Sequence, residues 1–246
     1  MAKVVILGDS NEAVFGPVIS EWLQTTGLAR ADIKFHAKGS SFAEWAPGKT
    51  LWKKVSDALG EDTRLVVIGL GGNMLTRSKV HHQIIRKLVE GVVARAPHAR
   101  LVWRGPPPAT ATKGRTIAGP KAKAFRYLKN KILKDVLTAM DFAVLDASLP
   151  KVEAKRRVYI DVIDLHAGGP APGRAGVAAG KLGTPECLAY ERKAIAAFKA
   201  LAGQVPSVGP WDTYTRSRDG MTVHVPLEVA RDLVTRHLVK LGAFAF

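Results

Sequence analysis

Two hydrophobic patterns alternate along the first part of the chain. Short runs of apolar residues, typical of buried strands, are separated by longer segments in which apolar residues recur at helical spacing. The runs that predict strands are Lys3–Leu7, Ala31–Ala37, Arg64–Gly69, Arg100–Trp103 and Phe142–Asp146. The segments that predict helices are Phe15–Thr25, Leu51–Leu59, Val80–Ala96 and Ala122–Met140.

Strands that alternate with helices over short links predict an α/β fold. We expect a three-layer α/β/α sandwich around a central, mostly parallel, five-stranded sheet. Ligands of such sheets bind at the carboxyl ends of the strands. Polar residues stand at these ends: Asp9 and Ser10 after the first strand, Gly39 after the second and Asn73 after the third.

The pattern loosens after the fifth predicted strand. Val158–Leu165 is apolar enough for another strand, whereas residues 167–184 are rich in Gly, Ala and Pro and favour irregular structure. Pro226–Leu241 has the pattern of a final helix with Pro in its first turn. We therefore predict one domain over residues 1–246, with an insertion or small subdomain at about 148–210.

The chain is strongly basic. It has 37 Lys and Arg residues against 21 Asp and Glu residues, a formal net charge of +16. The stretch from Arg104 to Lys134 contains nine basic residues and no acidic one. Such a stretch attracts polyanions, or else it is a solvated helix face and loop. We therefore expect contact with an anionic polymer through Arg104–Lys134.

Other features limit the class of protein. A single cysteine, Cys187, excludes an internal disulfide and a cysteine-based zinc site. No His-Glu-x-x-His spacing occurs, so we expect no metal, and we expect no cofactor. The opening residues are typical of a strand rather than a signal peptide, and no apolar run is long enough to span a bilayer. We expect a cytoplasmic or virion-associated protein.

Several residues have the chemistry that acyl transfer needs. Ser10 stands where a strand turns into a helix, but a serine needs an adjacent base to act as a nucleophile. His224, just before the last predicted helix, is the candidate base, and Asp219 is the candidate acid that orients it. The backbone amides of Ser10 and Gly39 and the side-chain amide of Asn73 are candidate oxyanion donors. Taken singly, Ser10 and Asn73 could be helix caps and Gly39 a turn residue.

Four motifs together resemble the sequence blocks of the GDSL, or SGNH, hydrolase family. They are ILGDSN at Ile6–Asn11, AKGSS at Ala37–Ser41, GLGGNM at Gly69–Met74 and RDGMTVH at Arg218–His224. A dinucleotide-binding interpretation of GLGGNM fails because the third glycine of G-x-G-x-x-G is missing.

The resemblance implies a role for each matched residue. Ser10 would be the nucleophile, His224 the base and Asp219 the acid. Gly39 and Asn73 would complete the oxyanion hole. The family's fold is a flavodoxin-like three-layer domain without a cofactor, and its members hydrolyse esters through an acyl-enzyme.

The acid is the least regular part of the match. Asp219 precedes His224 by five residues, where the family has three. Either the loop bulges, or a Ser-His dyad operates with a backbone carbonyl, or Asp212 is a more distant acid. His166, with Asp164 nearby, is a rival base, but a Gly- and Pro-rich stretch follows it rather than a helix.

The sequence also contains candidate substrate-binding residues. Trp45, Trp103 and Trp211 follow strands or lie in predicted loops, where exposed indoles stack on sugar rings, although Trp more often serves in packing. We take Trp45 and Arg104 as the candidate substrate-binding residues. The net charge favours an ester on a carbohydrate or cell-envelope polymer. The alternative is a non-catalytic module that binds an anionic glycan or nucleic acid through its basic surface.

Overall fold

The computed structural model describes residues 3–39, 42–74, 80–106, 110–111, 120–145, 152, 154–162, 221–222, 230–231 and 233–246. Most of the predicted insertion at 148–210 lies outside these residues, as does the first part of the predicted last helix.

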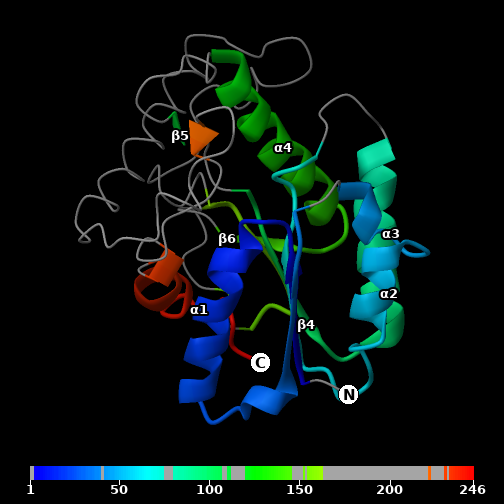
Figure 1. The fold of residues 1–246 in the computed structure, drawn as a ribbon, viewed down its shortest axis with the longest axis vertical. Helices are drawn as coiled ribbons and strands as arrows, with labels where there is room; N and C mark the ends of the chain where they lie inside the picture. The colour runs from blue at the N-terminus through cyan, green and yellow to red at the C-terminus, as the bar shows by residue number, and fades with distance from the viewer. Residues whose placement is uncertain are drawn as a thin grey trace.

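A parallel sheet forms the centre of the molecule (Figure 1). Its strand order is β2-β1-β3-β4-β7-β6, and every neighbouring pair is parallel. The strands are β1 Val4–Gly8, β2 Ile33–Ala37, β3 Leu65–Gly69, β4 Arg100–Arg104, β6 Ala143–Leu145 and β7 Arg157–Ile160. The predicted α/β fold with a parallel sheet is confirmed. The sheet has six strands rather than five. The sixth, β7, overlaps the first part of Val158–Leu165, which is apolar enough for another strand, and it lies between β4 and β6.

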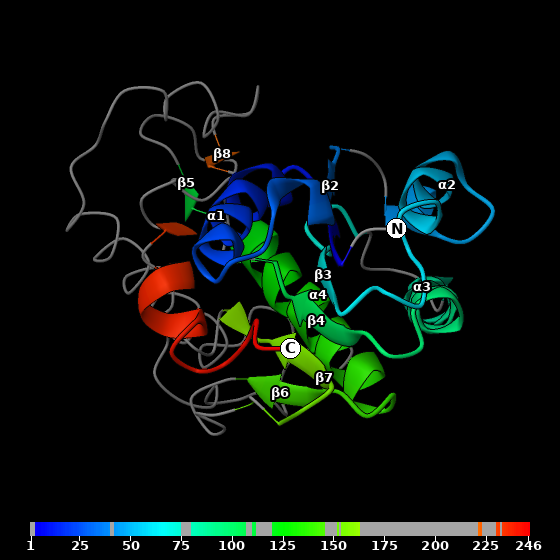
Figure 2. The same cartoon turned by 90° about the horizontal axis from the view of Figure 1, so that it is seen from below.

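Helices cover both faces of this sheet (Figure 2). On one face lie α1, Glu12–Thr25, and a short π-helix, η4, Leu233–Leu238. On the other face lie the 3₁₀ turn η2, Phe42–Trp45, and the helices α2 Thr50–Ser56, α3 Val80–Arg95 and α4 Pro120–Thr138. None of the helices in the described ranges is long and apolar enough to cross a membrane.

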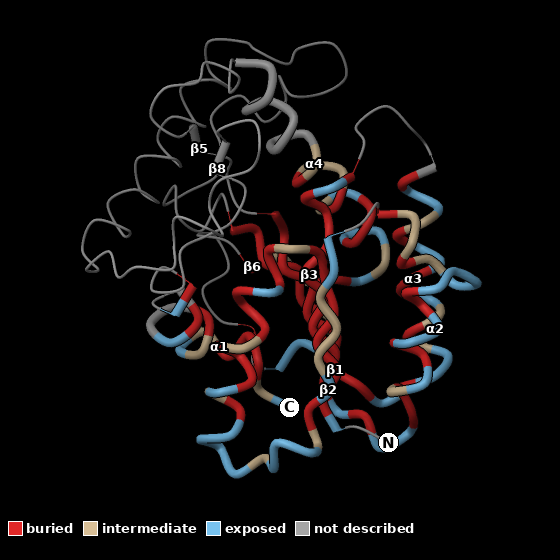
Figure 3. Tube along the Cα trace, viewed as in Figure 1, coloured by how far each residue is buried: buried red, intermediate tan, exposed pale blue. Residues whose placement is uncertain are grey.

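The two-sided cover explains the continuous apolar runs in the sequence. Side chains alternate across a strand, so Val4 and Ile6 pack with α1 while Val5 and Leu7 pack with α2 and α3. All residues of β1, β3 and β4 are buried, as Figure 3 shows for the centre of the sheet. Each fully buried Val, Leu or Ile contributes roughly 1.5–3 kcal/mol to folding.

A second, small sheet joins two distant parts of the chain. β5, Thr110–Ala111, pairs antiparallel with β8, Met221–Thr222. Both lie on the side of the molecule toward which the central strands run (Figure 1). Since β8 belongs to the RDGMTVH motif, this pairing brings part of that motif beside the segment that follows β4.

Candidate active site

The carboxyl ends of β1, β2 and β3 meet at one edge of the sheet. β1 pairs with both neighbours, and Gly8 is in register with Ala37 on one side and with Gly69 on the other. The helix after β1 covers one face and the helix after β3 covers the other, so the strand order reverses between β1 and β3. Ligands of parallel sheets bind at such a switch point.

Three predicted site residues lie at this edge. Ser10 is partly exposed in the turn between β1 and α1, and Gly39 and Asn73 are exposed after β2 and β3. A Cβ atom built on Gly39 would lie 3.6 Å from the Cβ atom of Ser10, an ordinary van der Waals distance, so Gly39 lies next to the serine. The structure thus brings a hydroxyl and an adjacent exposed backbone segment together.

The buried carboxylate of Asp9 holds this edge in shape. Its Oδ1 accepts a hydrogen bond from the amide of Asn11 at 2.9 Å, and its Oδ2 accepts one from the amide of Gly72 at 3.0 Å. The Asp9 amide in turn donates to the carbonyl of Gly69. The Asp9 carboxylate thus fixes the amide of Asn11, which directly follows Ser10, and the amide of Gly72, which directly precedes Asn73. In the sequence, Asp9 stands out only as a polar neighbour of Ser10.

A buried ion pair lies beneath the turn. Arg104 Nη2 is 2.7 Å from Glu12 Oε2, and both side chains are almost wholly buried. The guanidinium also lies over the ring of Phe15, 4.3 Å from its centre. Burial raises the pKa of Glu12, against the opposing effect of the Arg104 charge. Gly69 leaves room for the pair, because a Cβ there would lie 1.7 Å from Glu12 Oε2.

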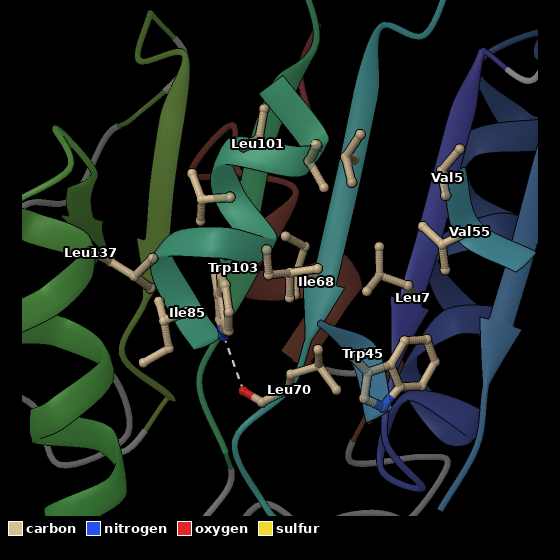
Figure 4. Packing of buried hydrophobic residues seen from close by; sticks show 14 of the residues in the cluster. Val5, Leu7, Trp45, Val55, Ile68, Leu70, Ile85, Leu101, Trp103 and Leu137 are labelled. Atoms are coloured by element: carbon tan, nitrogen blue, oxygen red, sulfur yellow. Dashed lines mark hydrogen bonds between the residues drawn. The ribbon is translucent and has the colours of Figure 1, made fainter. Parts of the chain in front are cut away.

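Two expectations about substrate contacts are corrected by burial. Arg104 is 2% exposed and held by Glu12, so its guanidinium is not free for a substrate. Trp45 is 1% exposed and packs near Leu7 and Val55 (Figure 4). Trp103 is also buried, and its indole donates to the carbonyl of Leu70 at 3.0 Å (Figure 4). Both aromatic side chains fill the core between sheet and helices rather than a surface that stacks on sugars.

Two basic residues near this edge were not singled out from the sequence. Lys129 of α4 donates from Nζ to the carbonyl of Gly72 at 2.7 Å. His81, at the start of α3, is 7% exposed and stacks on the ring of Phe42. Burial lowers the pKa of His81, and the charges of His82 and Lys129 lower it further. Lys129 belongs to the basic stretch, but nothing in the sequence distinguishes it from the other lysines there.

The remaining predicted site residues are not placed. His224, Asp219, Asp212, His166 and Trp211 lie outside the described residues. β8 ends two positions before His224 in the chain. Within the described ranges, no three His, Cys, Asp or Glu side chains gather in a way that could hold a metal ion.

Comparisons with known proteins give structural likeness only. No family model matches the sequence, and no curated protein matches it. A lipopolysaccharide acetyltransferase periplasmic domain from Salmonella ser. Paratyphi A is 14% identical with a TM-score of 0.44, over 83% of this chain and 84% of that one. Phospholipase A1 from Streptomyces albidoflavus NA297 is 18% identical with a TM-score of 0.42, over 60% and 80%.

A third similar structure is a putative arylesterase from Agrobacterium tumefaciens str. C58. It is 17% identical with a TM-score of 0.40, over 81% of this chain and 99% of that one. Likeness at this level shows the fold alone. A function for this chain must therefore be inferred from its own residues.

Proposed function

We propose that the chain is a serine hydrolase that cleaves an ester through an acyl-enzyme intermediate. The observation that carries the proposal is the close approach of Gly39 to Ser10 at the switch point of the sheet. A partly exposed hydroxyl there lies beside unhindered backbone, with the Asp9 carboxylate fixing the turn on both sides. The four motifs that resemble SGNH hydrolases support the same assignment.

In the first step the Oγ of Ser10 attacks the ester carbonyl carbon while His224 accepts the hydroxyl proton. The amides of Ser10, Gly39 and Asn73 stabilise the oxyanion, and each such donor is worth about 10²–10³ in rate. The bond to the alcohol oxygen then breaks, and the His224 imidazolium protonates the departing alcohol.

In the second step His224 takes a proton from water, which attacks the acyl-enzyme and releases the acid together with free Ser10. Because His224 must be neutral to accept a proton, activity rises with pH through about 6–7, the range in which an ordinary histidine loses its charge. Asp219 orients the imidazole in this scheme.

The proposed substrate is an acyl or acetyl ester of a carbohydrate or cell-envelope polymer. The net charge of +16 supports this choice, because a basic protein concentrates anionic polymers at its surface. The burial of Arg104 removes its guanidinium from the proposed contacts, and the burial of Trp45 removes stacking of its ring face on a sugar.

Labelling with a fluorophosphonate probe, followed by mapping of the modified residue, tests the assignment of the nucleophile. We expect the label on Ser10, and we expect Ser10→Ala to reduce 4-nitrophenyl acetate hydrolysis by at least about 10³-fold. Ser20→Ala is the matched control, because Ser20 lies buried on α1 with no hydrogen-bond partner for its hydroxyl among the described residues. This control should keep wild-type turnover.

Two results would contradict the proposal. One is a label on a serine other than Ser10 with full activity in Ser10→Ala. The other is the absence of turnover and labelling in the wild type together with salt-sensitive binding of a polyanion, which would instead support a binding module.

A further inference from the structure

A cavity lies beside the sheet edge, between strand β2 and the segments η2 and α2. Its volume is about 250 Å³, enough for a small chemical group. The residues that line it are Phe35, His36, Ala37, Lys38, Trp45, Leu51 and Lys54. β2 is the outermost strand of the described sheet, so no described strand covers its far side.

The lining combines apolar walls with groups that attract an anion. Lys38 and Lys54 are exposed cations, and none of the lining residues is acidic. Phe35, Trp45 and Leu51 supply the apolar part. A compact site of this composition fits a small organic anion carried on a less polar body.

Two buried polar atoms of the lining lack partners among the described residues. They are Nε1 of Trp45, which is always a donor, and Nε2 of His36. Leaving a buried donor unpaired is costly, so an acceptor brought by a ligand would be favourable there. Figure 4 shows the indole nitrogen of Trp45 on the side of the ring away from Leu7 and Val55.

The charge of the lining also acts on His36. Burial lowers the pKa of this imidazole first, and the charges of Lys54 and Lys34 lower it further. The charged residues of the cavity lining and of β2 are therefore Lys34, Lys38 and Lys54. An anion bound between them would offset their effect and raise the pKa of His36.

The cavity adjoins the candidate nucleophile. Lys38 is next in the chain to Gly39, and Gly39 lies next to Ser10. The amide of Lys38 also donates to the carbonyl of Gly8 at 3.1 Å, which ties this wall of the cavity to the end of β1. One wall of the cavity therefore ends one residue before Gly39.

We propose that this cavity binds the carboxylate of an acylated uronic acid, on the alcohol side of the ester. The inference rests on the proposed ester hydrolysis and specifies its substrate: an acidic sugar that carries the acyl group. The carboxylate lies between Lys38 and Lys54, and the indole N–H of Trp45 donates to the ligand.

A matched pair of esters tests the proposal in the complete protein. The substrates are the O-acetylated methyl glycosides of glucuronic acid and of glucose, which differ in the carboxylate. We expect kcat/KM to be at least tenfold higher for the glucuronoside, mainly through KM. Lys54→Met should remove most of this ratio.

Lys53→Met is the control, because Lys53 is an exposed neighbour on α2 that does not line the cavity. It should keep the wild-type ratio. A ratio near one in the wild type, or an equal loss in both lysine variants, would overturn the proposal.

Direct binding separates this inference from the proposed hydrolysis. Unacylated methyl glucuronoside should bind the wild type and raise the pKa of His36 in an NMR titration, and methyl glucoside should do neither. If neither ester is hydrolysed but the glucuronoside binds and Lys54→Met abolishes binding, the cavity assignment stands and the hydrolase proposal fails. Tighter binding of glucose 6-phosphate than of the glucuronoside would overturn the choice of a carboxylate.

Discussion

Gly39 lies next to Ser10 without presenting a side chain, and this makes it a sensitive probe of the site. Its backbone is not in the left-handed conformation that favours glycine, and among the described residues a Cβ there would meet only Ser10 Cβ, at 3.6 Å. Gly39→Ala should therefore change the free energy of unfolding by less than about 0.5 kcal/mol.

In the proposed mechanism, the same methyl group would stand beside the ester as it approaches the hydroxyl. We expect Gly39→Ala to lower kcat by about ten- to hundredfold, since small displacements of reacting atoms have effects of that size. Urea unfolding and steady-state kinetics on one ester measure both quantities. Unchanged kcat in a well-folded Gly39→Ala variant would contradict the placement of the substrate at Ser10.

At the scale of single residues, the motifs predicted the positions of Ser10, Gly39 and Asn73 along the chain. They did not predict the hydrogen bonds that Asp9 accepts from the amides of Asn11 and Gly72. The bond from Gly72 joins segments more than 60 residues apart in the chain. Such a contact depends on the pairing of β1 with β3, and no local pattern encodes it.

At the scale of elements, the Glu12–Arg104 ion pair connects the first turn of α1 with the end of β4. Arg104→Met should lower the free energy of unfolding by about 3–5 kcal/mol, because it leaves a buried carboxylate without its partner. Urea denaturation measures this loss.

The double variant Glu12→Met/Arg104→Met is the control. Replacing both charges by apolar side chains removes the desolvation cost as well as the attraction, so most of the lost stability should return. A double variant as unstable as Arg104→Met alone would show that packing around Arg104, rather than the unpaired charge, causes the loss.

The elements themselves follow the sequence closely, with two informative differences. α1 begins at Glu12 rather than near Phe15, because the Asn11 carbonyl already accepts hydrogen bonds from the amides of Val14 and Phe15. β7 lies between β4 and β6, although it follows β6 in the chain. Strand order depends on which edges remain open as the sheet assembles, and apolar periodicity does not record it.

At the scale of the whole molecule, the carboxyl-terminal segment completes the core on the α1 face. Phe244 is 1% exposed and lies against Trp22, with 6.1 Å between the ring centres. Arg100 Nη2 donates to the carbonyl of Gly242 at 2.8 Å, which ties the same segment to β4. Residues 242–244 thus pack against the central sheet and α1.

Phe244→Ala should cost about 3–5 kcal/mol of stability, because it leaves a cavity in this core. Phe246→Ala is the matched control: Phe246 is 53% exposed, and its truncation should change stability by less than about 0.5 kcal/mol. Thermal or urea unfolding compares the two. Equal stability of both variants would mean that the terminal segment does not contribute to the core.

The sequence by itself determined the alternation of strands and helices, the buried character of β1, β3 and β4, and the order of the motif residues along the chain. These features are local, because periodicity and turn residues act within one element. Tertiary structure alone decided that Arg104 and Trp45 are buried, that Asp9 joins two strand ends, and that a basic cavity adjoins Gly39. Burial and contact depend on what packs against a side chain, and the packing partners come from distant parts of the chain.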